Sequence, residues 1–260
     1  MRYGGNTPCL EVRTPAGHTI ILDCGTGVVA LGHLLAEITP PNGLQLMVLL
    51  SHLHADHIQG LPFFAPLYDE RNRIFFHCPR TCDVTGGQVI SRLMGPPYFP
   101  IPFAETKSRK RFRPIGEERL PAFDVDVVTR ALNHPQGCLG FRIEAETGVF
   151  TYITDHEHGV ARCDDSVREL AEAADLLVYD AQYTPAEYRS RLGWGHSTWE
   201  EAVRVAREAG VKRLALFHHD PDHSDCCLDQ ALAEASSRFT RVTMAAERTM
   251  VRLQRRPVPC

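Results

Sequence analysis

A cluster of metal-binding side chains directly follows the apolar run 44–50, which has the composition of a buried strand. His52, His54, Asp56 and His57 lie within six consecutive positions. Imidazole nitrogens and carboxylate oxygens are ligands that zinc, manganese and iron accept. A His-x-His pair at a strand end can bind one ion, and Asp56 and His57 can reach a second ion nearby. Because two closely spaced ions can generate hydroxide and stabilise a hydrolytic transition state, the cluster predicts dinuclear hydrolytic chemistry.

Further candidate ligands follow other predicted strands along the chain: His134, Asp155, and the adjacent His218 and His219. The predicted strands that precede them cover residues 123–131, 148–154 and 211–217. Pro135 prevents the segment after His134 from continuing as a regular helix, which suits a ligand in a fixed loop. These positions can supply the ligands that the first cluster lacks.

The pattern His52-x-His54-x-Asp56-His57 resembles the motif of the metallo-β-lactamase fold superfamily. The resemblance extends along most of the chain, through residues 3–12, 20–27 and 60–64. The later motifs resemble most closely the phosphodiesterase branch, which includes ribonuclease Z and the phosphoribosyl cyclic phosphodiesterases. The motif is specific for the fold and says little about the substrate.

The resemblance implies an α/β (α+β) fold, the four-layer αββα metallo-β-lactamase sandwich, as a single hydrolase domain over residues 1–260. Relatives usually have a strand before the segment that matches residues 3–12, so either the domain lacks this first N-terminal strand or the sequence starts late relative to its relatives. A missing edge strand would expose a sheet edge to pairing with another chain.

The resemblance also implies a ligand set of seven residues around two divalent ions. The first ion is held by His52, His54 and His134, the second by Asp56, His57 and His218, and Asp155 bridges the two. His218 is preferred over His219 because it comes first after its strand. Asp23 is expected to support the ligands without binding metal. Zinc is the expected metal, with manganese and iron as alternatives that the donor atoms equally accept.

A second pair resembles the proton-transfer residues of ribonuclease Z-like enzymes. Asp180 follows the predicted strand 176–179, and His196 lies in a His-x-Thr motif. The resemblance implies that Asp180 orients His196, which protonates the leaving oxygen. The predicted catalytic residues are therefore Asp56, His196 and Asp180.

Together these residues predict a phosphodiesterase that uses a metal-bridging hydroxide on a cyclic nucleotide, a cyclic phosphoribose or an RNA-like diester. RNA is less favoured, because the long arm with which ribonuclease Z captures tRNA is not evident and the net charge is −4. Two alternatives remain: a lactonase, thioesterase or β-lactamase on the same fold, and a non-catalytic metal-binding signalling module. Relatives are often homodimers, which makes a homodimer an expectation here.

Composition narrows the remaining choices. The 260 residues are 43% hydrophobic and 23% charged, as in an ordinary globular protein. No apolar run is long enough to span a bilayer, and no leader is evident, so the prediction is a cytoplasmic protein without membrane association. The nine cysteines do not form a disulfide-like pattern, which predicts reduced thiols. A structural zinc on Cys78, Cys82, Cys226 and Cys227 is a disfavoured alternative.

Local patterns predict further elements. Strands are expected over residues 9–22, 44–50, 74–77, 123–128, 148–154, 176–179 and 211–217, and helices over 198–209 and 228–237. Residues 91–113 are a candidate lid or substrate-facing insertion. Its proline- and aromatic-rich part, 95–103, cannot form a regular helix or a central strand. Five positive charges within residues 107–113 favour an exposed loop over a phosphate-binding arm.

Overall fold

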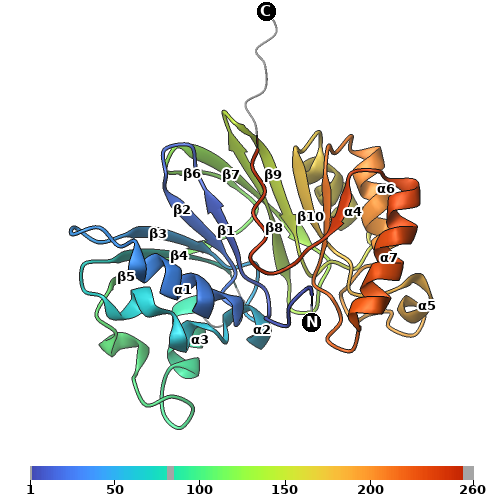
Figure 1. Ribbon diagram of the computed structural model, residues 1–260. Helices are drawn as coiled ribbons and strands as arrows, with labels where there is room; N and C mark the ends of the chain where they lie inside the picture. Colours follow the sequence, from blue (N-terminus) through green and yellow to red (C-terminus); the bar gives the residue numbers. More distant parts are fainter. Residues whose placement is uncertain (1, 81–84, 254–260) are drawn as a thin grey trace, which may run out of the picture. The chain divides into compact units, whose positions relative to one another are not determined.

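A computed structural model describes residues 2–80 and 85–253. The chain divides into two compact units. The N-terminal unit comprises Asn6–Gly116, and the C-terminal unit comprises Met1–Gly5 with Glu117–Cys260. Each unit contains one β-sheet with its own helices, giving a mixed α/β protein with two sheets (Figure 1).

The sheet of the N-terminal unit has the spatial order β1-β2-β3-β4-β5. Its strands are β1 (Leu10–Arg13), β2 (Thr19–Leu22), β3 (Gln45–Leu49), β4 (Arg73–Pro79) and β5 (Arg109–Ile115). β1 pairs antiparallel with β2, and the remaining pairs are parallel. The four residues of β2 and the last four of β3 are buried, as their mostly apolar sequence predicts. Because β2 and β3 are parallel, the residues after both strands lie at one edge of the sheet.

The connections in this unit are helical. They are α1 (Gly27–Glu37), α2 (Ala55–Ile58), α3 (Gly86–Leu93) and the 3₁₀ turns η1 (Leu61–Phe63), η2 (Ala65–Tyr68) and η3 (Phe103–Glu105). The helix α1 packs on η1 and η2, with its Val28 and Leu35 fully buried in the apolar core. The short α2 begins within the histidine-rich motif, so it fixes the spacing of Asp56 and His57.

The sheet of the C-terminal unit has the order β12-β11-β10-β9-β8-β7-β6. Its strands are β6 (Arg119–Ala122), β7 (Val125–Leu132), β8 (Cys138–Ala145), β9 (Gly148–Ile153), β10 (Leu176–Asp180), β11 (Leu214–Phe217) and β12 (Val242–Met244). The strands β6 to β9 form an antiparallel meander, whereas β9 to β12 are parallel. The carboxyl ends of β9, β10 and β11 therefore meet at one edge, the usual place for ligand-binding residues in α/β sheets.

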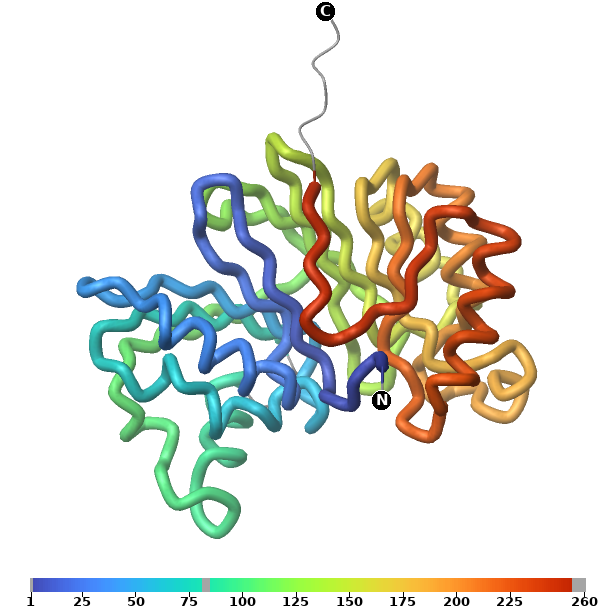
Figure 2. The backbone as a smooth tube through the Cα atoms, viewed as in Figure 1, coloured from blue at the N-terminus to red at the C-terminus, as the bar shows by residue number. Residues whose placement is uncertain are grey.

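The helices of the C-terminal unit are α4 (Ala161–Ala171), α5 (Pro185–Tyr188), α6 (Trp199–Glu208) and α7 (Asp225–Arg238). The helix α4 packs on β7 and β8, α6 on β10 and β11, and α7 on β12. Residues 2–5 lie beside the segment that follows β12 (Figure 2), where the Tyr3 carbonyl accepts from Glu247 N at 3.0 Å. The Tyr3 hydroxyl donates to Asp229 of α7 at 2.6 Å. These contacts fix the first described residues within the C-terminal unit.

Most of the predicted elements are confirmed. Thr198 caps α6, its hydroxyl accepting from Glu201 N, and Gly210 follows the helix with φ +65°. Residues 95–102 contain neither helix nor strand, and Phe103 begins only the short 3₁₀ turn η3, so this segment forms no regular helix or central strand, as predicted. One prediction is wrong: residues 109–113 belong to the edge strand β5 and are not a loop. There Lys110 folds back onto η3, donating to the Phe103 carbonyl at 3.2 Å.

In the described parts of the chain, none of the helices combines the length and apolar character needed to cross a membrane.

Candidate metal centre

Backbone strain marks three of the residues at the strand ends. Asp23 follows β2, Asp155 follows Thr154 at the end of β9, and His218 follows β11. Their φ angles are +59°, +49° and +59°, in the left-handed region that non-glycine residues rarely adopt. Such strain costs of the order of 1–3 kcal/mol and persists where function needs the resulting direction of the side chain. The strained backbone at these three positions makes them candidates for functional residues at the ends of the strands.

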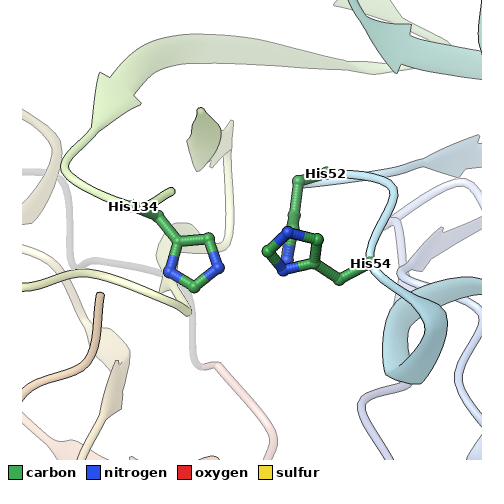
Figure 3. A group of neighbouring side chains, drawn as sticks. All are labelled: His52, His54 and His134. Atoms are coloured by element: carbon green, nitrogen blue, oxygen red, sulfur yellow. The ribbon is translucent and has the colours of Figure 1, made fainter. Parts of the chain in front are cut away.

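The N-terminal unit brings together the residues of the histidine-rich motif. The rings of His52 and His54 lie side by side, with centroids 4.4 Å apart (Figure 3). The His57 ring lies 4.2 Å from that of His52, and its Nε2 is 3.4 Å from Asp56 Oδ2. His52 and His57 are buried, whereas Asp56 is partly exposed. We call these four residues the N-terminal ligand set.

Asp23 organises this ligand set from behind. It is fully buried and accepts hydrogen bonds from Ser51 N at 2.7 Å and from Ser51 Oγ at 2.8 Å. Its Oδ2 also accepts from His57 Nδ1 at 2.9 Å. A carboxylate on Nδ1 fixes the tautomer and presents Nε2 as the ligand atom. Ser51 Oγ lies 3.1 Å from His52 Nδ1, so the same network orients a second ring.

The C-terminal unit supplies a second set around Asp155. Its Oδ1 lies 3.3 Å from His218 Nε2, and its Oδ2 lies 3.5 Å from His134 Nε2 (Figure 3 shows His134 in the turn after β7). Two ligands bound at ~2.1 Å in a tetrahedral arrangement are about 3.4 Å apart. The distance from each Asp155 oxygen to its neighbouring imidazole nitrogen is therefore close to the distance expected between two ligands of the same ion. We call these three residues the C-terminal ligand set.

Both histidines of the C-terminal ligand set, His134 and His218, form a hydrogen bond through Nδ1. His134 Nδ1 donates to the Gly195 carbonyl at 2.8 Å, and His218 Nδ1 donates to Gln182 Oε1 at 3.1 Å. Both rings therefore carry the proton on Nδ1 and present Nε2 toward Asp155. The donor atoms of the two sets, imidazole nitrogens and carboxylate oxygens, are of the kinds that a divalent cation such as zinc accepts.

His219 has a different environment from His218. Its Nε2 is hydrogen-bonded to the Ala245 carbonyl at 3.0 Å, and burial lowers its pKa. The Nε2 atom of His219 is therefore bonded to the backbone of the segment after β12. The geometry favours His218 as the ligand.

Asp180 and His196 form a hydrogen-bonded pair beside Asp155. His196 Nδ1 donates to Asp180 Oδ2 at 2.8 Å, and Asp180 Oδ1 accepts from the backbone of Gln182 and Ser197. Candidate ligand atoms of Asp155, Asp180, His196 and His218 lie within 4.8 Å of one another. His196 Nε2 is 4.0 Å from Asp155 Oδ2, farther than the two imidazoles of the ligand set. This spacing and the occupied Asp180 carboxylate favour a proton-transfer role over metal ligation.

Several supporting residues could not be found from the sequence. The main one is Glu157, which is buried and whose carboxylate accepts from Gly193 N and Gly195 N, each at 2.8 Å. It fixes the loop that carries both the acceptor for His134 and His196. His156 is also buried, at 1% exposed, and its Nε2 lies 3.4 Å from Asp164 Oδ1.

The tyrosine nearest to His196 is not a base. The Tyr183 ring lies 6.0 Å from that of His196, and burial raises the pKa of Tyr183 to about 12. Its hydroxyl is therefore protonated at neutral pH.

Cysteines take no part in the candidate metal groups that the described residues form. Of the four cysteines considered for a structural zinc, Cys82 lies outside those residues. Burial raises the pKa of the Cys78 thiol to about 12, which disfavours the thiolate that zinc requires.

Comparisons with known proteins place the chain in a family. The profile of the Beta-lactamase superfamily domain matches residues 18–219. Ribonuclease Z of Metallosphaera sedula is 29% identical over 246 residues, which cover 80% of this chain and 81% of that protein.

Two solved structures are similar in fold. The metallo-beta-lactamase fold protein YhfI of Bacillus subtilis has a TM-score of 0.70 and 23% identity, covering 95% of this chain and 93% of that one. Human tRNase Z, short form, has a TM-score of 0.65 and 20% identity, covering 99% and 96%.

The profile spans most of the chain, including the histidine-rich motif and the residues after β9 and β11. The protein therefore belongs to the Beta-lactamase superfamily and is a metal-dependent hydrolase of the metallo-β-lactamase fold.

Proposed function

We propose that the protein is a dinuclear metal-dependent phosphodiesterase. In this proposal His52, His54 and His134 hold one ion, Asp56, His57 and His218 hold the other, and Asp155 bridges them. The contacts of Asp155 support the bridging role, because its two oxygens each lie beside a different imidazole. The similarity to proteins named ribonuclease Z supports a phosphodiester substrate.

The hydrogen bond between Asp180 and His196 is the observation that carries the choice of substrate class. Diester hydrolysis expels an alkoxide, which is a poor leaving group unless it is protonated. His196 has its Nδ1 fixed by a buried carboxylate, so its Nε2 is the nitrogen available to donate a proton. Esters and lactones on the same fold do not require such a pair. The pair therefore favours a phosphodiester over a carboxylic ester.

Two bound ions would activate water and stabilise negative charge on the phosphate oxygens. The chain's own residues then have three tasks. Asp23, Gln182 and the Gly195 carbonyl hold the ligand imidazoles in one tautomer. Asp180 stabilises the protonated His196, and His196 delivers its proton from Nε2 to the leaving oxygen.

Hydrolysis of bis(p-nitrophenyl) phosphate by chelator-stripped protein, after addition of zinc, manganese or iron, tests this proposal. We expect turnover that depends on the added metal and that His218→Ala abolishes. His219→Ala is the matched control, since it removes the neighbouring imidazole outside the ligand set. Metal binding without turnover of any diester would contradict the proposal and favour an ester or lactone substrate.

The leaving group tests the role of His196 separately. A p-nitrophenolate departs without protonation, whereas the ribose oxygen of a 2′,3′-cyclic nucleotide needs a proton. We expect His196→Ala to lower kcat on the cyclic nucleotide by about 10²–10⁴-fold and to affect bis(p-nitrophenyl) phosphate much less. Equal losses on both substrates would contradict the general-acid role.

A further inference from the structure

An exposed aromatic and cationic group lies next to the proton-transfer pair. Residues 191–194 form a turn closed by a hydrogen bond from Trp194 N to the Arg191 carbonyl at 3.1 Å. The Arg191 guanidinium carbon lies 4.9 Å from the centre of the Trp194 ring and 5.8 Å from that of Tyr183. Trp194 is 58% exposed, which is unusual for so large an apolar side chain. We call Arg191 and Trp194 the 191–194 platform.

The cation of this platform is available for an anionic ligand. Within residues 2–80 and 85–253, Arg191 forms no ion pair with a carboxylate. Its guanidinium lies over two rings and also makes a side-chain hydrogen bond with Tyr183, and its remaining N–H groups can donate to a ligand. Such an arrangement suits a phosphate oxygen. The Tyr183 ring, which contacts this guanidinium, also makes an edge-on contact with His196.

The backbone of the platform is fixed by Glu157. Its Oε1 accepts from Gly193 N and its Oε2 accepts from Gly195 N, so one buried carboxylate binds the amides on both sides of Trp194. The two glycines have φ angles of +84° and +86°. An exposed indole is thus presented from a loop that is held in place, not from a mobile tip. Ordering this loop on ligand binding costs little, which favours a binding role.

We propose that Trp194 and Arg191 bind a nucleoside monophosphate group of the substrate on its leaving-group side. The base stacks on the free face of the indole, and the guanidinium donates to a phosphate oxygen. This inference rests on the proposed phosphodiesterase function and narrows its substrate to diesters that carry a nucleobase. Stacking on an aromatic side chain is tolerant of base identity, so the platform selects nucleotides without selecting one sequence.

Binding of adenosine 5′-monophosphate to the metal-loaded protein, compared with ribose 5-phosphate, tests the inference. The two probes share the phosphate and the sugar, so their difference isolates the base. We expect Trp194→Ala to weaken adenosine 5′-monophosphate roughly 5- to 150-fold and to leave ribose 5-phosphate unchanged. Arg191→Ala should weaken both probes. Fluorescence reports the stacking directly, because the chain's other tryptophan, Trp199, is buried.

The chain offers matched controls for both substitutions. Leu192→Ala removes a neighbouring side chain that is 64% exposed, and Arg189→Ala removes a neighbouring exposed cation. Both are expected to leave the two affinities unchanged. The inference is overturned if the unaltered protein binds the two probes equally, or if Trp194→Ala and Leu192→Ala have the same effect.

Measurements of turnover distinguish a failure of this inference from a failure of the proposed phosphodiesterase function. We expect Trp194→Ala to raise KM for 2′,3′-cyclic adenosine monophosphate while kcat stays the same. The 2,3-cyclic phosphate of methyl riboside, which lacks a base, should be unaffected. If the unaltered enzyme hydrolyses neither diester, the phosphodiesterase proposal fails, whereas the binding of the two monophosphates still decides the role of the platform. Equal effects of Trp194→Ala on the two diesters would overturn the platform alone.

Discussion

The Gly195 carbonyl determines which nitrogen of His134 faces Asp155. The contact is close: a Cβ atom at Gly195 would lie 2.2 Å from His134 Nδ1, and the φ of this glycine is +86°. Any side chain here must displace the imidazole from its acceptor. We therefore expect Gly195→Ala to weaken metal binding by about 10–100-fold, the usual effect of losing a partner of a ligand histidine. Metal titration of the chelator-stripped protein measures this.

Gly193 provides the control for Gly195. Its φ is similar, at +84°, but a Cβ there would have no atom within 4 Å. Gly193→Ala therefore imposes the same kind of backbone strain without the clash. If both variants lose metal affinity equally, strain in the loop and not the His134 contact explains the effect.

Cysteine reactivity is a second property set residue by residue. Burial raises the pKa of the Cys78 thiol to about 12, and it raises the pKa of Cys24 well above its ordinary value. At pH 8 only ~10⁻⁴ of Cys78 is thiolate, whereas Cys226 is exposed. We expect iodoacetamide to label Cys226 rapidly and to leave Cys24 and Cys78 unmodified in the folded protein. Peptide mass spectrometry checks this, and equal labelling in denaturant is the control.

The sequence predicts the identity of the ligands better than the way they are held. His134, Asp155 and His218 each follow an apolar strand, so their order along the chain reveals them. The Gly195 carbonyl that orients His134 lies 61 positions away and is a backbone group, which leaves no sequence pattern. The role of Glu157 could not be predicted for a similar reason, because its partners are two backbone amides.

At the scale of elements, apolar runs predict the strands that support the site. The strands β2, β3, β9, β10 and β11 contain few polar residues and are almost wholly buried. The strand β5 was not predicted, because the five basic residues within 107–113, four of which lie in β5, resemble a solvent-exposed loop. In the structure β5 is an edge strand, where charged side chains are common since they discourage pairing with another chain.

In the N-terminal unit, the turn after β2 packs against the turn after α2 at two glycines, Gly25 and Gly60. Gly60 N donates to the Cys24 carbonyl at 3.0 Å, and a Cβ at Gly60 would lie 2.1 Å from the Gly25 carbonyl oxygen. We expect Gly60→Ala to separate the turn that carries Asp23 from the helix α2, because backbone atoms cannot yield as a flexible side chain can. The expected result is a lower free energy of unfolding, by roughly 1–3 kcal/mol, together with weaker metal binding. Chemical denaturation with and without metal measures both.

Gly116 is the control for this packing. It has no atom within 4 Å of a built Cβ, so Gly116→Ala should leave the stability and the metal affinity almost unchanged. A Gly60→Ala protein that keeps both properties would show that the two turns need not approach so closely.

At the scale of the whole molecule, the proposed assignment of ligands to two ions can be tested by counting the ions that are bound. His52 belongs to the N-terminal unit, and His134 and His218 belong to the C-terminal unit. In the proposal His52 and His134 hold the same ion, whereas His218 holds the other. The effects of substituting two ligands of the same ion should be non-additive, whereas the effects of substituting ligands of different ions should be additive. The number of bound ions therefore reports which ligands are shared.

Paired substitutions turn this into a test. We expect His52→Ala and His134→Ala each to remove one ion, and the double variant to lose no more than that ion. His52→Ala combined with His218→Ala should lose both ions, because each change affects a different one. Equilibrium dialysis followed by elemental analysis counts the metal, and circular dichroism verifies that each variant is folded. Loss of both ions in the first pair would mean that His52 and His134 belong to separate ions. The assignment of His52 would then have to change, whereas the bridging role of Asp155, which rests on its contacts with His134 and His218, would not be affected.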